Sequence, residues 1–116
     1  MLILLMLLRI CWVIALLLGL SLWSGHLLQL ISLHMLLGLI IAVLVATLAI
    51  AAGRRRLWGL LVAGLVVAVL LPIVGLNQTT WLPGPNHWLV ELFHLLLGVV
   101  AIAIAEVSAQ RIKRLA

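Results

Sequence analysis

The chain has 116 residues, of which 68% are hydrophobic and 8% are charged, and its mean hydropathy is +1.49. A soluble domain of this size would have to expose most of that apolar surface to water, so the composition excludes a soluble globular protein and predicts an integral membrane protein in contact with the lipid bilayer. The net charge of +5 comes mainly from two basic clusters, which we interpret as signals of membrane orientation and not of nucleic-acid binding.

The first apolar segment covers about residues 2–23, and about 20 apolar residues suffice to cross a bilayer. It has neither the basic start nor the small-residue cleavage pattern of a signal peptide, so we expect it to be retained as a helix. Arg9 lies inside this segment. We expect its guanidinium either to pair with Glu106 of the last segment or to extend to the cytoplasmic interface.

The second apolar segment covers about residues 26–52 and ends at Gly53, before three consecutive arginines. Ser24 precedes it and is expected to cap its N-terminus, because a serine hydroxyl accepts a hydrogen bond from a free backbone N–H of the first turn. The third segment covers about residues 57–76, and Pro72 is expected to kink its last turns.

A small-residue face on the third segment, formed by Gly64, Ala68 and Gly75, predicts close packing against another helix. A polar loop follows at residues 77–86 and ends in Asn86, a candidate cap for the next helix. The fourth apolar segment then covers about residues 87–110.

These segments predict an all-α membrane protein with a single four-helix transmembrane domain over residues 1–116, arranged as an up-down-up-down bundle. Basic clusters follow the second and fourth segments, so both mark one side, and we expect both termini to be cytoplasmic and the membrane to be a bacterial plasma membrane. Interfacial tryptophans fit this orientation, with three expected at the outer side and one at the inner side: Trp23, Trp81 and Trp88, and Trp58.

The second and fourth segments share a short motif. His34 to Gly38 and His94 to Gly98 both read H-x-L-L-G, and each has another histidine seven or eight residues upstream. The two helices run in the same direction in the predicted bundle. We therefore expect His34 and His94 at similar depth, roughly 10–12 Å below the helix starts.

Two histidines at matching depth on parallel helices predict ligation of one b-type haem between these helices. An imidazole on each side of the ring saturates the iron, which suits electron transfer and not oxygen binding. Gly38 and Gly98 lie one turn further in, where the absence of a side chain would let a flat macrocycle approach the backbone. The alternative for each deep histidine is a hydrogen bond to a backbone carbonyl or to Glu91.

The upstream histidines, His26 and His87, are expected at the outer interface, either as amphipathic anchors or near haem propionates. A rival hypothesis is a mononuclear zinc, copper or iron site built from His87, Glu91 and His94 of one helix, with His34 as the fourth ligand. Glu91 has further alternatives, namely a hydrogen bond to a neighbour, the orientation of a ligating imidazole, or a proton acceptor beside a quinone.

On these residues the chain resembles small membrane-embedded b-type cytochromes, which have four helices, histidines on facing helices and glycines near the ring. The resemblance implies His34 and His94 as axial ligands and Gly38 and Gly98 as the close-approach glycines. It implies a single haem, because two-haem members space their histidines further apart along each helix.

The resemblance also implies a non-catalytic electron carrier or redox-complex subunit. Its redox partner would be another protein or a quinone, and the chain could act as a homo-oligomer or within a larger membrane complex. The competing hypothesis is an accessory or structural membrane subunit without a cofactor.

Overall fold

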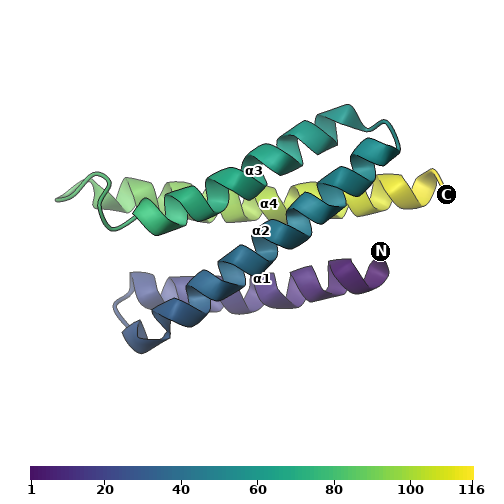
Figure 1. Ribbon diagram of the computed structural model, residues 1–116. Helices are drawn as coiled ribbons and strands as arrows, with labels where there is room; N and C mark the ends of the chain where they lie inside the picture. The colour runs from purple at the N-terminus through teal and green to yellow at the C-terminus, as the bar shows by residue number, and fades with distance from the viewer.

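The computed structural model describes all 116 residues and contains four long helices and no strands (Figure 1). Each of the four helices is long and apolar enough to cross a membrane, which confirms the predicted class. The helices are α1 (Leu2–Trp23), α2 (Ile31–Arg54), α3 (Trp58–Asn77) and α4 (His87–Arg114).

The predicted start of the second helix is wrong, because α2 begins at Ile31 after a 3₁₀ turn, η1, at Leu28–Leu30. Positive backbone φ angles at Gly25 (83°) and Leu27 (55°) turn the chain before the helix can start. Ser24 does not cap α2. Its hydroxyl donates instead to the carbonyl oxygens of Leu20 and Ser21, at the end of α1.

Other helix ends differ less. The last helix continues four residues beyond the predicted end, through the basic tail to Arg114. Asn86 stands at the N-cap position of α4, as expected, but its side chain makes no capping hydrogen bond. Pro72 lies inside α3.

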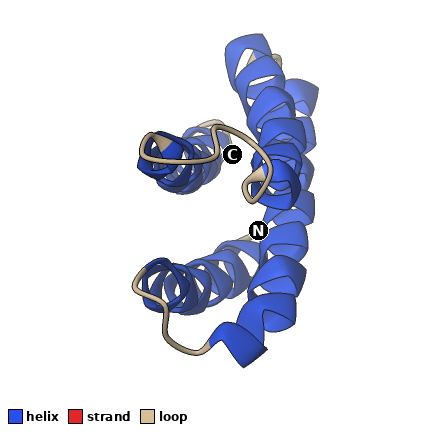
Figure 2. Ribbon diagram, turned by 90° about the vertical axis from the view of Figure 1, so that its left-hand side faces the viewer, coloured by secondary structure: helices blue, strands red, loops and turns tan.

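Consecutive helices run in opposite directions, and both chain ends lie at the same end of the bundle as the α2–α3 connection (Figure 1). We call this the terminal end, and the opposite end, with the connections at 24–30 and 78–86, the loop end. Figure 2 looks along the bundle from the loop end and shows α1 and α4 on one side and α2 and α3 on the other. Helix α2 crosses the bundle obliquely and contacts all three other helices.

The closest helix crossing joins α2 to α3. A Cβ placed on Gly64 would lie 2.5 Å from the Cβ of Ala49, so only glycine permits this approach. Ala68 is buried in the same region, which confirms the predicted small-residue face. The core draws on all four helices and consists of 14 buried residues: Leu5, Leu8, Ala15, Ile41, Val45, Leu48, Val67, Ala68, Leu71, Val74, Leu97, Ala101, Ala105 and Ala109.

Candidate functional site

The structure brings His34 of α2 and His94 of α4 together near the loop end. Their ring centroids are 6.2 Å apart and the ring planes meet at 72°. The Nδ1 atoms of both rings are buried and make no hydrogen bond of regular geometry, although the backbone of Ala15 lies near the His34 ring. A buried polar atom without a partner carries a desolvation cost of about 1–3 kcal/mol, so two of them in one place mark a candidate binding site.

Each of these imidazoles packs against a glycine of the preceding helix. A Cβ on Gly19 of α1 would lie 3.1 Å from Cε1 of His34, and a Cβ on Gly75 of α3 would lie 3.0 Å from Cε1 of His94. Cε1 is the ring corner between the two nitrogens. The nitrogen-bearing side of each ring therefore packs closely on the backbone of a glycine, where an added methyl group would crowd the imidazole.

The repeat seen in the sequences of α2 and α4 therefore also includes the helix before each of them, so that the hairpin α1–α2 resembles the hairpin α3–α4. In α1 the hydroxyl of Ser21 donates to the carbonyl oxygen of Leu17 at 2.9 Å, two residues after Gly19. In α3 the amide of Asn77 donates to the carbonyl oxygen of Ile73 at 2.7 Å, two residues after Gly75. The first helix of each hairpin thus contains the sequence glycine, leucine and a polar residue. The side chain of that polar residue donates a hydrogen bond to the backbone carbonyl oxygen four residues earlier.

The two glycines predicted to face a macrocycle have different surroundings. No atom of another part of the chain lies within 4 Å of a Cβ placed on Gly38, whereas a Cβ on Gly98 would lie 3.9 Å from Nε1 of Trp12. The Trp12 indole N–H donates to the carbonyl oxygen of Gly98 at 2.8 Å. A flat ring approaching Gly98 would therefore meet the Trp12 side chain first.

The two upstream histidines differ in position, because His26 lies on a connection and His87 is the first residue of a helix. His26 is exposed on the connection before α2, with its Nδ1 3.2 Å from the hydroxyl of Ser24. His87 opens α4, and its ring contacts the carbonyl oxygen of Trp81 at 3.1 Å and the carboxylate of Glu91 at 3.3 Å. Both His87 nitrogens therefore face oxygen atoms, one from the backbone and one from a carboxylate.

Glu91 lies on α4 between the two levels of histidines. One of its carboxylate oxygens contacts His87, and the other is buried without a hydrogen-bond partner. No three histidine, cysteine or acidic side chains come together anywhere in the chain. The four side chains of the rival metal-site hypothesis therefore do not form a common donor set.

The distance between the two deep histidines is similar to that of two imidazoles bound to one metal ion, but their rings are not oriented for ligation. A metal ion lies about 2 Å from a ligating imidazole nitrogen, so two rings on opposite sides of one ion have centroids about 6 Å apart. The observed 6.2 Å agrees with this value. Because Cε1 of each ring faces a glycine, ligation requires both rings to turn until one nitrogen of each points to the shared centre.

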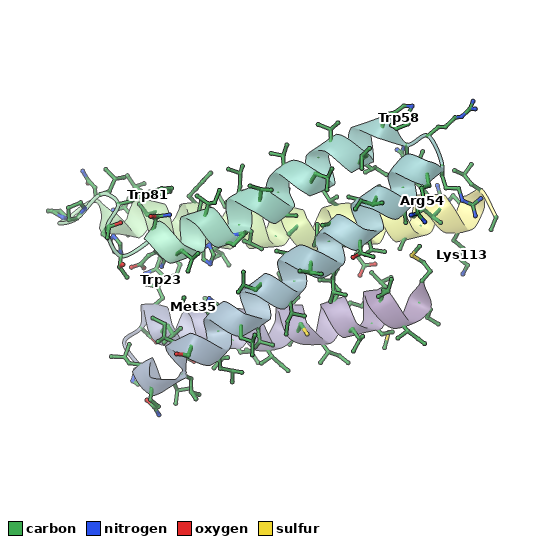
Figure 3. All side chains as sticks on the ribbon, in the orientation of Figure 1. Trp23, Met35, Arg54, Trp58, Trp81 and Lys113 are labelled. Atoms are coloured by element: carbon green, nitrogen blue, oxygen red, sulfur yellow. The ribbon has the colours of Figure 1, made fainter.

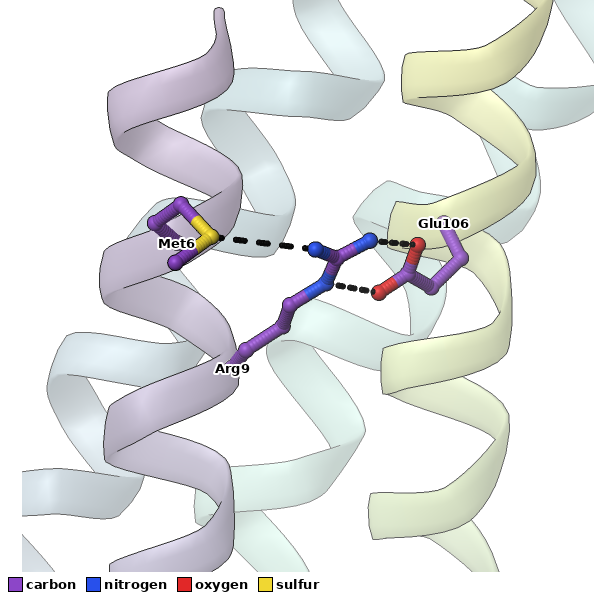
Figure 4. A network of polar contacts seen from close by, with 3 residues as sticks. All are labelled: Met6, Arg9 and Glu106. Carbon is purple, nitrogen blue, oxygen red and sulfur yellow. Dashed lines mark hydrogen bonds and ion pairs between the residues drawn. The ribbon is translucent and has the colours of Figure 1, made fainter.

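Arg9 and Glu106 form an ion pair between α1 and α4, which confirms the first of the two expectations for Arg9. Nε of Arg9 donates to one carboxylate oxygen at 2.6 Å, and a terminal nitrogen donates to the other at 2.8 Å (Figure 4). The pair lies toward the terminal end and is separate from the histidine site.

Sequence reasoning did not identify Trp12, Gly19 or the role of Gly75 beside His94. A signal for Gly19 exists in the sequence, because Gly19 and His34 are nearly equidistant from the 24–30 connection, whereas Gly75 and His94 are not equidistant from the 78–86 connection. In an antiparallel hairpin, residues equidistant from the turn lie at the same level. Nothing in the sequence singles out Trp12.

Comparisons with protein-family models, with curated proteins and with solved structures find no match for this chain.

Proposed function

We propose that this chain is a membrane electron-transfer protein, or the haem-bearing subunit of a membrane redox complex. It binds one haem b between α2 and α4, with His34 and His94 as axial ligands. The observation that carries the proposal is the pair of imidazoles, 6.2 Å apart, whose Nδ1 atoms are both buried and make no hydrogen bond of regular geometry.

The number of available donors favours haem over a mononuclear metal ion. A protein-bound zinc ion takes three or four protein ligands, and no three suitable side chains come together in this chain. A haem iron already has four ring nitrogens and needs two axial ligands, which two imidazoles provide.

When bound, the haem supplies one-electron transfer, and the chain supplies its surroundings. Gly19 and Gly75 leave room for the imidazoles, and the open space at Gly38 lies one turn from His34. The apolar helices exclude water from the site, which favours a stable six-coordinate iron over ligand exchange. The chain is then an electron carrier and not a catalyst, with a quinone or another membrane protein as its redox partner.

For the membrane orientation we propose an up-down-up-down bundle in a bacterial plasma membrane with both termini in the cytoplasm. Arg54 and Lys113 lie at the terminal end of the bundle (Figure 3), and basic residues are retained on the cytoplasmic side of membrane proteins. Trp23 and Trp81 lie at the loop end, and Trp58 at the terminal end (Figure 3). This is the distribution of tryptophans at two membrane interfaces.

The test is a visible spectrum of the purified protein after expression with added haem precursor. A Soret band, with sharp reduced bands after addition of dithionite, supports the proposal. A protein that is folded, shown by its helical circular dichroism, and lacks any Soret band rules it out and favours a structural subunit. Metal analysis of the same sample shows whether another metal is bound.

A further inference from the structure

The ion pair between Arg9 and Glu106 lies at a depth where lipid tails are expected. Arg9 is seven residues beyond the start of α1 at Leu2 and Glu106 is eight residues before the end of α4 at Arg114, which corresponds to about 10–12 Å along each helix. The two hydrogen bonds hold the guanidinium at the level of the Glu106 carboxylate. Arg9 therefore does not extend to the membrane surface.

This ion pair is only partly covered by the chain itself. The Arg9 side chain is 46% exposed and the Glu106 side chain 29% exposed. The third guanidinium nitrogen has only the sulfur of Met6, at 3.7 Å, as a partner (Figure 4). Charged side chains inside a membrane are costly and normally face protein or water, so this part of the α1–α4 face needs a polar cover.

The charges of this face are self-complementary. Under a two-fold axis along the bundle, the same surface meets itself, so Arg9 of each copy approaches Glu106 of the other. The exposed Gln110, one turn beyond Glu106, adds an uncharged hydrogen-bonding group. Exposed apolar residues flank the pair on both helices, among them Val13 and Val99.

We propose that the α1–α4 face, centred on Arg9 and Glu106, is the interface of a homodimer. Each intrachain ion pair then joins a cluster of four alternating charges, in which the unused donors of Arg9 reach the carboxylate of the second copy. A lipid phosphate fits this face less well, because Glu106 already neutralises Arg9 and would repel an anion. The proposal does not depend on haem binding.

Paired charge variants test the interface. Arg9→Glu leaves two acids on the face, and Glu106→Arg leaves two bases. We expect each variant expressed alone to lose the dimer, and the two expressed together, with different affinity tags, to co-purify. Wild-type chains with the two tags should also co-purify. Failure of both the wild-type pair and the charge-variant pair to co-purify would overturn the proposal.

Disulfide cross-linking in native membranes provides a second test that leaves the charges unchanged. In a Cys11→Ala background, a Val13→Cys chain co-expressed with a Val99→Cys chain should form a cross-linked dimer on mild oxidation, because α1 of one copy faces α4 of the other in the proposed interface. Val66→Cys is the matched control for Val13→Cys, because both valines are 50% exposed and Val66 lies on α3, on the other side of the bundle. Equal cross-linking when Val66→Cys replaces Val13→Cys, or no cross-linking between Val13→Cys and Val99→Cys, contradicts the proposed interface.

Discussion

The imidazole of His34 lies against Gly19, and a Cβ at that glycine would come within 3.1 Å of Cε1 of the ring. Gly75 and His94 repeat the contact at 3.0 Å in the other hairpin. Each histidine thus packs against a glycine of the helix that precedes it, although His34 and His94 belong to helices that are not consecutive in the sequence.

Substitution Gly19→Ala should destabilise the protein relative to Gly38→Ala. The new methyl group at position 19 overpacks the His34 ring, which typically costs about 1–3 kcal/mol. At position 38 no atom lies within 4 Å of the new methyl group, and alanine is favoured over glycine in a helix by about 1 kcal/mol. The free energy of unfolding, measured in mixed micelles by helical circular dichroism, compares the two variants.

Equal stabilities of the two alanine variants would show that the His34 ring moves away without cost. Gly75→Ala provides an independent repeat of the measurement, because its contact with His94 has the same geometry. We expect it to behave like Gly19→Ala.

The hydrogen bond from Trp12 to the Gly98 carbonyl should contribute measurably to the packing of α1 on α4. Trp12→Phe removes the indole N–H and keeps an aromatic ring, so it should lower the free energy of unfolding by about 0.5–1.5 kcal/mol. Trp58→Phe is the control, since Trp58 is 61% exposed and its indole makes no hydrogen bond within the chain. A smaller loss for Trp12→Phe than for Trp58→Phe would argue against a role for this bond.

Much of the fold follows from the sequence because apolar length and basic clusters are local properties. Four runs of apolar residues predict four helices, and α1, α3 and the start of α4 lie within one residue of their predicted ends. The start of α2 was mispredicted because Leu27 adopts a left-handed backbone conformation, with φ of 55°. Leucine rarely adopts this conformation, so the residues around position 27 did not indicate a turn there.

The site was predictable in part. The shared H-x-L-L-G motif led to His34 and His94, and these two rings do lie together. The grouping of His87 and Glu91 with them rested on spacing along one helix, which cannot show how far a side chain is from another helix. The Trp12 bond and the Gly75 contact depend on how α1 and α3 pack on α4, and no local pattern encodes that packing.

Glu91→Gln separates the haem proposal from the rival metal site. One Glu91 oxygen is buried without a partner, and the other contacts only His87. We therefore expect the glutamine variant to keep the spectrum of the wild-type protein and to fold with similar stability. His87→Ala should likewise keep it. Loss of a bound metal in both variants, without loss of folding, would instead support ligation by His87 and Glu91.

The orientation in the membrane predicts a cytoplasmic C-terminus and an external loop at 78–86. A green fluorescent protein fused after Ala116 should fluoresce, because this protein matures in the cytoplasm. In a Cys11→Ala background, Thr79→Cys should react with a membrane-impermeant maleimide added to intact spheroplasts. A dark fusion together with an unreactive cysteine would show that the bundle has the opposite orientation.

The most direct test of the central claim compares the reduced spectra of the wild-type protein, His34→Ala, His94→Ala and His26→Ala, each purified after haem-supplemented expression. Ligation by the two deep histidines predicts a low-spin spectrum in the wild-type protein and in His26→Ala, and its loss in each of the other two variants. Low-spin spectra retained in both His34→Ala and His94→Ala would contradict it.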